Sequence, residues 1–159
     1  MTAHAPYEDV VRCLLDPLFH STRNTPSLFR NRGDGTFQDV TKQANLDRCY
    51  GTKQAAIADF DGDGWPDLLL ANGSLDSGRL EPSVILRNEE GKKFSQWSYL
   101  PGFSIPSNVV AAAVVDANHD GRPDVYLAFN PKLQGSNLKG GLFVNAGKSR
   151  KPGRLVTRP

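Results

Sequence analysis

The stretch Asp59-Phe-Asp61-Gly-Asp63-Gly-Trp65-Pro-Asp67 carries aspartates at its first, third, fifth and ninth positions. A second stretch, Asp116-Ala-Asn118-His-Asp120-Gly-Arg122-Pro-Asp124, repeats this pattern 57 residues later. We refer to residues 59–67 as loop one and to residues 116–124 as loop two. The glycine at the sixth position of each loop, Gly64 or Gly121, permits a sharp turn, so that alternate side chains of the curled loop converge on one point.

Oxygen donors at positions 1, 3, 5 and 9 suit a hard cation, and the backbone carbonyl of position 7 supplies a further oxygen. Calcium fits this donor set, because magnesium demands a smaller octahedral shell and zinc prefers His or Cys. His119 lies off the ligand register. The predicted ligands are Asp59, Asp61, Asp63, the Trp65 carbonyl and Asp67 in loop one, and Asp116, Asn118, Asp120, the Arg122 carbonyl and Asp124 in loop two.

The two loops differ in charge. Loop one offers four carboxylates, whereas loop two offers three, with the neutral Asn118 at its third position. We therefore expect two calcium sites, the second weaker than the first. Without a cation the carboxylates of loop one repel one another, which weakens the local fold. The alternative is an Asp/Gly turn that binds nothing, but such a turn does not require oxygen donors at every second position twice in register.

An EF-hand or dockerin-type loop is the other well-known use of this aspartate spacing. Such a loop requires an acidic residue at position 12. Leu70 and Leu127 stand there instead, and strand-like residues follow each loop directly. The spacing therefore argues against a helix–loop–helix site.

The loops belong to a longer repeat. Ser27-Leu-Phe-Arg-Asn31 is echoed by Val84-Ile-Leu-Arg-Asn88 and by Gly141-Leu-Phe-Val-Asn145, at intervals of 57 residues. Asp67 and Asp124 each lie 21 residues before the asparagine of their own repeat. Self-similarity at a fixed period of about this size is typical of propellers and other repeat architectures.

Between these fixed points the sequence alternates short β-type segments with clusters of Gly, Asn and Asp. The predicted strands are 27–31, 36–41, 54–58, 67–71, 83–88, 93–98, 109–115, 124–129 and 141–145. Gly33 and Gly35 suit the positive φ of a tight turn between the first two. Four strands per repeat is the count of a propeller blade, so we expect an all-β fold of four-stranded antiparallel blades, with fewer than three blades in this chain. A sandwich without repeats is the alternative.

The chain divides into three parts. Residues 27–147 hold the blade repeats with both loops, and residues 148–159 form a basic tail. Residues 1–26 allow two interpretations. Pro6 followed by a stripe of apolar residues indicates an amphipathic helix, whereas Asp9, 22 residues before Asn31, indicates a strand of an incomplete first repeat. The repeat frame favours the strand.

Composition excludes several classes of protein. A formal charge of +2 is too small for a nucleic-acid-binding surface, and the apolar stretches are far shorter than the roughly 20 residues that cross a bilayer. Acidic and basic residues interrupt the first 20 positions, so they do not resemble a secretory signal. Cys13 and Cys49 allow either a disulfide or two free thiols.

The pattern D-x-D-x-D-G-x-x-D between apolar strands, with Leu28-Phe-Arg-Asn-Arg-Gly-Asp-Gly-Thr-Phe37 upstream, resembles the FG-GAP/VCBS repeat of integrin α-subunit propellers and of the cartilage acidic protein and UnbV group. The resemblance covers about residues 27–145. It implies calcium held in the hairpin between the first two strands of a blade, and an extracellular or periplasmic protein that serves adhesion or recognition. Such propellers usually have about seven blades, so closure of a ring by this chain alone is in doubt.

No nucleophile elbow, phosphate loop, zincin motif or dinucleotide fingerprint is present. We therefore expect no enzyme, but a calcium-binding scaffold that recognises a protein or glycan partner. An open array leaves blade faces and sheet edges uncovered, so self-association or packing against missing blades is expected. The alternatives are a non-catalytic propeller segment of a polysaccharide-active enzyme and a remnant with no function of its own.

Overall fold

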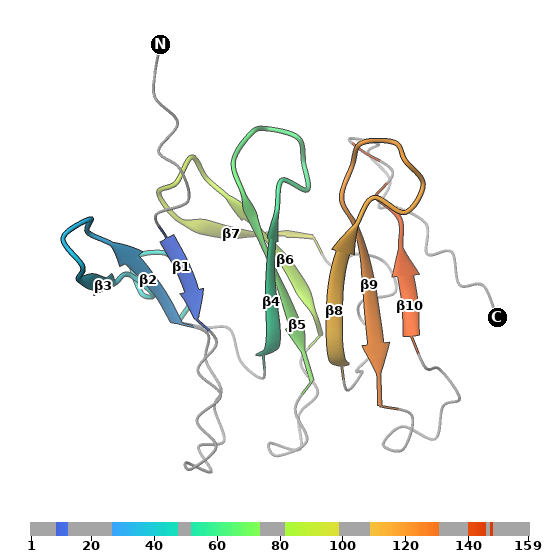
Figure 1. Cartoon of the computed structure of the whole chain (residues 1–159), viewed down its shortest axis with the longest axis horizontal. Coiled ribbons are helices and arrows are strands. Elements are labelled where there is room, and N and C mark those ends of the chain that lie inside the picture. The colour runs from blue at the N-terminus through green and yellow to red at the C-terminus, as the bar shows by residue number, and fades with distance from the viewer. Residues whose placement is uncertain are drawn as a thin grey trace.

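The computed structural model describes residues 9–12, 27–47, 52–73, 82–98, 109–130, 140–145 and 147. In these ranges the regular structure consists of ten strands in three antiparallel sheets, which stand next to one another in chain order (Figure 1). The predicted all-β class is thereby confirmed. No helix in the described ranges has the length and hydropathy that crossing a membrane requires.

The first sheet has the order β1-β2-β3, formed by β1 (Asp9–Arg12), β2 (Ser27–Asn31) and β3 (Phe37–Asp39). Strand β1 pairs antiparallel with β2, so this part of the N-terminal segment is extended. The turn between β2 and β3 has Gly33 at φ 78° and Gly35 at φ 86°, as the sequence predicts.

The second sheet has the order β4-β5-β6-β7, formed by β4 (Thr52–Ala58), β5 (Asp67–Asn72), β6 (Val84–Asn88) and β7 (Phe94–Ser98). The third has the order β10-β9-β8, formed by β8 (Val109–Val115), β9 (Asp124–Phe129) and β10 (Gly140–Phe143). Within the described residues the middle sheet alone has the four strands predicted for a blade, and its neighbours have three each.

Strand β5 lies at the centre of the structure, and all six of its residues are buried. Leu68 and Leu70 pack toward the first sheet, whereas Leu69 and Ala71 pack toward the third. A strand covered on both faces is expected to be a continuous apolar run rather than an alternating one. The sequence Leu-Leu-Leu-Ala satisfies that requirement.

Two cores follow from this arrangement. The core between the first and second sheets contains Leu28, Val40, Ala44, Leu46, Leu68, Leu70 and Leu86. The core between the second and third sheets contains Phe60, Leu69, Ala71, Ile85, Val109, Val125, Leu127 and Phe143. Phe60 is notable because it belongs to loop one, so that loop one is anchored in the junction between two sheets.

Polar contacts reinforce the junction between the second and third sheets. The side chain of Gln54 on β4 accepts a hydrogen bond from the Ala112 backbone N–H at 2.8 Å and donates one to the Ala112 carbonyl at 2.9 Å. The Asn145 side chain donates to the Phe60 carbonyl at 2.8 Å. These hydrogen bonds therefore link the backbones of β8 and loop one to side chains on the other side of the junction.

We expect Gln54→Ala to lower the free energy of unfolding by about 1–2 kcal/mol, because both backbone groups of Ala112 lose their partner in a partly buried place. Gln38 on β3 is exposed, so Gln38→Ala is a matched control and should change stability by less than about 0.5 kcal/mol. Urea unfolding of both variants measures the difference. Equal stabilities would show that the Gln54 contacts contribute nothing.

The outer face of the third sheet carries apolar side chains that are exposed or half-buried in the described structure. Its members are Ala111, Ala113, Val115, Tyr126, Ala128 and Leu142. Tyr126 is 44% exposed, whereas Leu69, its equivalent 57 residues earlier, is completely buried against the third sheet. This position of the repeat is thus buried in the second sheet and exposed in the third.

Several predictions concern segments outside the described residues. These are the state of Cys13 and Cys49, and the basic tail that begins at Lys148.

Candidate metal centre

Both predicted loops are hairpin connections between the first two strands of a sheet. Loop one joins β4 to β5, and loop two joins β8 to β9. The glycine at the sixth position is left-handed in each, with φ 90° at Gly64 and 81° at Gly121. The fourth position is left-handed as well, with φ 72° at Gly62 and 60° at His119. The two loops therefore curl in the same way. In loop two, His119 adopts the left-handed backbone conformation that glycine adopts more readily.

The aspartate at position 1 holds the curl of each loop together. In loop one, Asp59 accepts hydrogen bonds from the backbone N–H groups of Gly62 at 2.8 Å and Gly64 at 2.9 Å. In loop two, Asp116 accepts from Asp120 at 3.0 Å and Gly121 at 2.9 Å. The N–H of Gly121, followed by those of the residues before it, lowers the pKa of Asp116 below its ordinary value. The carboxylate is thus stabilised in its charged form.

The aspartate at position 9 is buried and joins the loop to the next strand. Asp67 accepts from the Phe60 N–H and the Asn88 N–H, both at 2.9 Å. Asp124 accepts from Ala117 at 3.0 Å and from Asn145 at 2.7 Å. Burial raises the pKa of Asp67, an effect that its two N–H donors oppose.

These bonds explain the fixed distance of 21 residues between aspartate and asparagine in each repeat. The backbone N–H of the asparagine binds the buried aspartate, and its side-chain oxygen accepts from a glycine in the turn that follows. The latter bonds are Gly33 to Asn31 at 2.9 Å, Gly91 to Asn88 at 2.7 Å and Gly147 to Asn145 at 3.0 Å. The asparagine is therefore a turn cap rather than a binding residue.

Loop one gathers three of its predicted ligands. One carboxylate oxygen from each of Asp59, Asp61 and Asp67 lies within 4.8 Å of the other two. Oxygens on opposite sides of a calcium ion are about 4.6–5.2 Å apart, because each lies about 2.3–2.6 Å from the ion. The three oxygens therefore fit around one calcium ion, and the all-oxygen donor set matches the preference of that ion.

Asp63, the ligand predicted at position 5, contacts an arginine. Its Oδ2 atom lies 2.7 Å from Nη2 of Arg87 on β6, and its Oδ1 atom accepts from the Trp65 N–H at 2.9 Å. The hydrogen bond from Arg87, followed by that from Trp65, lowers the pKa of Asp63. Arg87 Nε also lies 2.8 Å from Asp61 Oδ2, without the angle of a hydrogen bond, so this second contact is electrostatic.

Loop two repeats the backbone bonds but differs in its charges. Asn118 donates to Asp120 Oδ2 at 2.8 Å, and Arg122 at position 7 forms an ion pair with the same oxygen. Within the described part of the chain, the acids of loop two do not form a three-carboxylate group of the kind found in loop one. This difference agrees with the lower charge that the sequence gives loop two.

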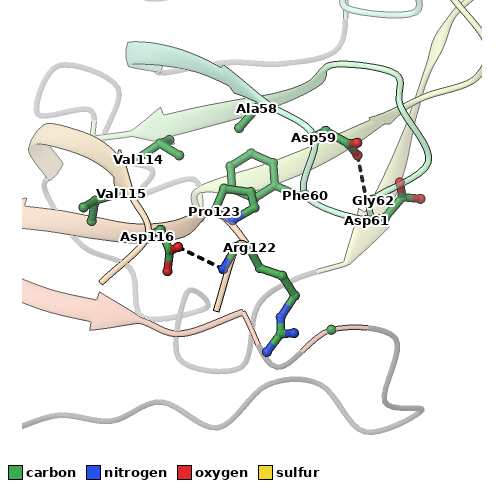
Figure 2. A pocket seen from close by; sticks show the side chains of 12 residues that line it. Ala58, Asp59, Phe60, Asp61, Gly62, Val114, Val115, Asp116, Arg122 and Pro123 are labelled. Atoms are coloured by element: carbon green, nitrogen blue, oxygen red, sulfur yellow. Dashed lines mark hydrogen bonds between the residues drawn. The ribbon is translucent and has the colours of Figure 1, made fainter. Parts of the chain in front are cut away.

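A pocket of about 650 Å³ lies between the two loops. Figure 2 shows Asp59 and Asp61 at its loop-one side, and Asp116 and Arg122 at its loop-two side. Its apolar lining comes from Phe60 and Pro123 together with the aliphatic side chains of Ala58, Val114 and Val115. The pocket therefore combines carboxylates, one guanidinium group and an aromatic ring at the junction of two sheets.

The sequence analysis missed the roles of three residues around the loops, although it had already identified Asn145 as a fixed point of the repeat. Arg87 pairs with two ligand positions, Phe60 fills the core beneath loop one, and Asn145 ties that loop to the third sheet. The pairing of Asp63 with Arg87 was not detectable, because it depends on the distance between β6 and the loop. The apolar character of Phe60 among four aspartates was a signal that could have been read.

Comparison with known proteins gives one family match and two relatives. Residues 8–70 match the model of an FG-GAP-like repeat. The chain is 29% identical to cartilage acidic protein 1 of Xenopus tropicalis over 119 residues and 32% identical to that of Homo sapiens over 128 residues. These alignments cover 74% and 79% of this chain but only 18% of each relative. The chain thus spans less than a fifth of the length of the curated relatives it matches.

Proposed function

Because this chain carries an FG-GAP-like repeat, a β-propeller element, we propose that it is a calcium-binding propeller segment that acts as a recognition or adhesion scaffold. A catalytic role is not part of this proposal. The relatives carry the name cartilage acidic protein 1, which supports an extracellular or periplasmic setting.

The observation that carries the calcium proposal is the group formed by Asp59, Asp61 and Asp67, with oxygens within 4.8 Å of one another. When bound, calcium supplies positive charge to these carboxylates and ties the hairpin to the start of β5. Extracellular sites of this chemistry bind calcium with dissociation constants of about 10⁻⁴–10⁻³ M, which suits the calcium level outside cells.

We assign the same role to equivalent positions of both loops. The proposed ligands are Asp59, Asp61, Asp63, the Trp65 carbonyl and Asp67, and then Asp116, Asn118, Asp120, the Arg122 carbonyl and Asp124. Loop two is proposed as the weaker site, because it has three carboxylates and its Asp120 is paired with Arg122.

The proposed partners are a protein or a glycan, and a further blade. The pocket between the loops offers a polar surface beside an aromatic ring. The outer face of the third sheet offers an apolar surface whose repeat equivalents in the second sheet are buried or half-buried. We propose that another sheet of this repeat type covers that face, from a second copy of the chain or from blades of a longer protein.

Isothermal titration with calcium, together with thermal melts, tests the metal proposal. We expect two binding events of unequal affinity and a melting temperature that rises with calcium. Each site should add about 2.7 kcal/mol to the free energy of unfolding at a hundredfold excess of calcium over its dissociation constant. Asp61→Ala should abolish the tighter event, whereas the exposed Asp47→Ala should leave both unchanged. A titration without heat and a melt unaffected by calcium or chelator would refute the proposal.

A further inference from the structure

Among the described residues, Arg87 is the basic side chain that forms ion pairs with the predicted ligands of loop one. It projects from β6 and not from the loop itself, and it reaches two successive ligand positions. Its Nε lies 2.8 Å from Asp61 Oδ2, and its Nη2 lies 2.7 Å from Asp63 Oδ2. Its side chain is 44% exposed, whereas the Asp61 side chain is 7% exposed, so the ion pair joins a partly exposed cation to a nearly buried carboxylate.

The oxygens of these two aspartates are already in use. Asp61 Oδ1 accepts from the Asp63 N–H at 3.1 Å, and Asp63 Oδ1 accepts from the Trp65 N–H at 2.9 Å. The Oδ2 atoms, which do not take part in these turn bonds, are the ones that Arg87 contacts. A divalent cation that draws on Asp61 and Asp63 must therefore compete with the guanidinium group for them, and it also meets repulsion from a positive charge close by.

Loop two lacks this arrangement. The residue 57 positions after Arg87 is Val144, which has no charge. The arginine that contacts loop two is Arg122, which belongs to the loop and pairs with Asp120. Of the two loops, loop one is thus the one that pairs with an arginine from a neighbouring strand.

From this geometry we propose that Arg87 is a built-in counter-ion of loop one, which competes with calcium for Asp61 and Asp63 and sets the affinity of the site. The inference rests on the calcium site proposed above. With the guanidinium group in contact, the loop keeps its shape at low calcium, and calcium must replace an existing ion pair. Arg87 therefore reduces the difference in calcium affinity between loop one, which has four carboxylates, and loop two, which has three.

Terbium provides a readout for loop one, because it replaces calcium and its emission is excited by a nearby tryptophan. Trp65 stands at position 7 of loop one, where loop two has Arg122. Terbium binding, and its displacement by calcium, should be measured in the full chain with Arg87→Met, which keeps the aliphatic stem. Arg32→Met is the matched control, because Arg32 is an exposed arginine in the turn between β2 and β3 and belongs to neither loop.

We expect Arg87→Met to tighten calcium binding at loop one by about tenfold or more, because a repelling charge and a competing partner are removed. In chelator, the same variant should melt at a lower temperature than the wild type, because its carboxylates are left uncompensated. Arg32→Met should leave the terbium signal of loop one unchanged. Arg87→Gln, which keeps hydrogen-bond donors without the charge, should show the same tightening and serves if the methionine variant does not fold in chelator.

Each result decides between the alternatives. If the wild type binds terbium and the Arg87 variants bind calcium equally well or more weakly, Arg87 is not a competitor and the inference is wrong, while the calcium proposal stands. If the wild type gives no signal but the variants do, competition by Arg87 is supported. If neither the wild type nor the variants bind, both proposals fail.

Discussion

Asp67→Ala is expected to lower the free energy of unfolding by about 3–5 kcal/mol, even in chelator. Asp67 is completely buried, and its two oxygens accept the N–H groups of Phe60 and Asn88. Each buried N–H left without a partner costs about 1–3 kcal/mol. The variant should also lose calcium binding at loop one, because one of the three grouped carboxylates is gone.

Urea unfolding in chelator separates the structural role of Asp67 from its proposed role as a ligand. Asp67→Asn keeps the shape of the side chain but replaces one hydrogen-bond acceptor by a donor. We therefore expect it to lower the free energy of unfolding by about 2 kcal/mol or more. The exposed Asp47→Ala is the control and should stay within about 0.5 kcal/mol of the wild type. If Asp67→Ala unfolds like the wild type in chelator, the hydrogen bonds described here do not stabilise the hairpin.

Leu69→Ala is expected to lower the free energy of unfolding by about 2–5 kcal/mol, because it leaves a cavity in the core between the second and third sheets. Tyr126 occupies the equivalent position of the next repeat but is 44% exposed. Tyr126→Ala should therefore cost about 1 kcal/mol or less in the isolated chain. The comparison keeps the repeat position constant and contrasts a side chain that a neighbouring sheet covers with one that is exposed.

Light scattering of the same variants tests whether another sheet covers Tyr126. If copies of the chain associate through the outer face of the third sheet, Tyr126→Ala should weaken the association, whereas Leu69→Ala should act mainly on stability. A wild-type chain that stays a soluble monomer at high concentration would argue against self-association. Equal costs for both substitutions in a monomer would contradict the different burial of Leu69 and Tyr126.

Much of the fold was predictable because it is encoded locally. The apolar runs of β5 and β8 and the glycines between β2 and β3 give the strands and turns directly. The ends of strands were less certain. Predicted strand 36–41 is shorter in the structure, because Thr41 turns back to bond the Leu28 N–H through its hydroxyl, at 2.9 Å. The residues after β3 then enter the core through Val40 and Leu46 instead of extending the sheet.

The candidate site was predictable in its residue types but not in all its contacts. The spacing of Asp59, Asp61 and Asp67 predicted oxygens that converge, and the structure brings those three together. It did not predict that Asp63 pairs with Arg87, which lies 24 residues away and approaches only through the pairing of β5 with β6. Contacts between sheets, such as Gln54 with Ala112, depend on how repeats pack and have no local signal.

Asn145 contacts both halves of the candidate centre. Its side chain binds the carbonyl of Phe60, which stands between two aspartates of loop one, and its backbone N–H binds Asp124 of loop two. We therefore expect a shift in the backbone of loop one to reach a carboxylate of loop two through this single residue. In thermodynamic terms, we expect the two loops to be coupled, so that whatever orders one of them changes the free energy of ordering the other.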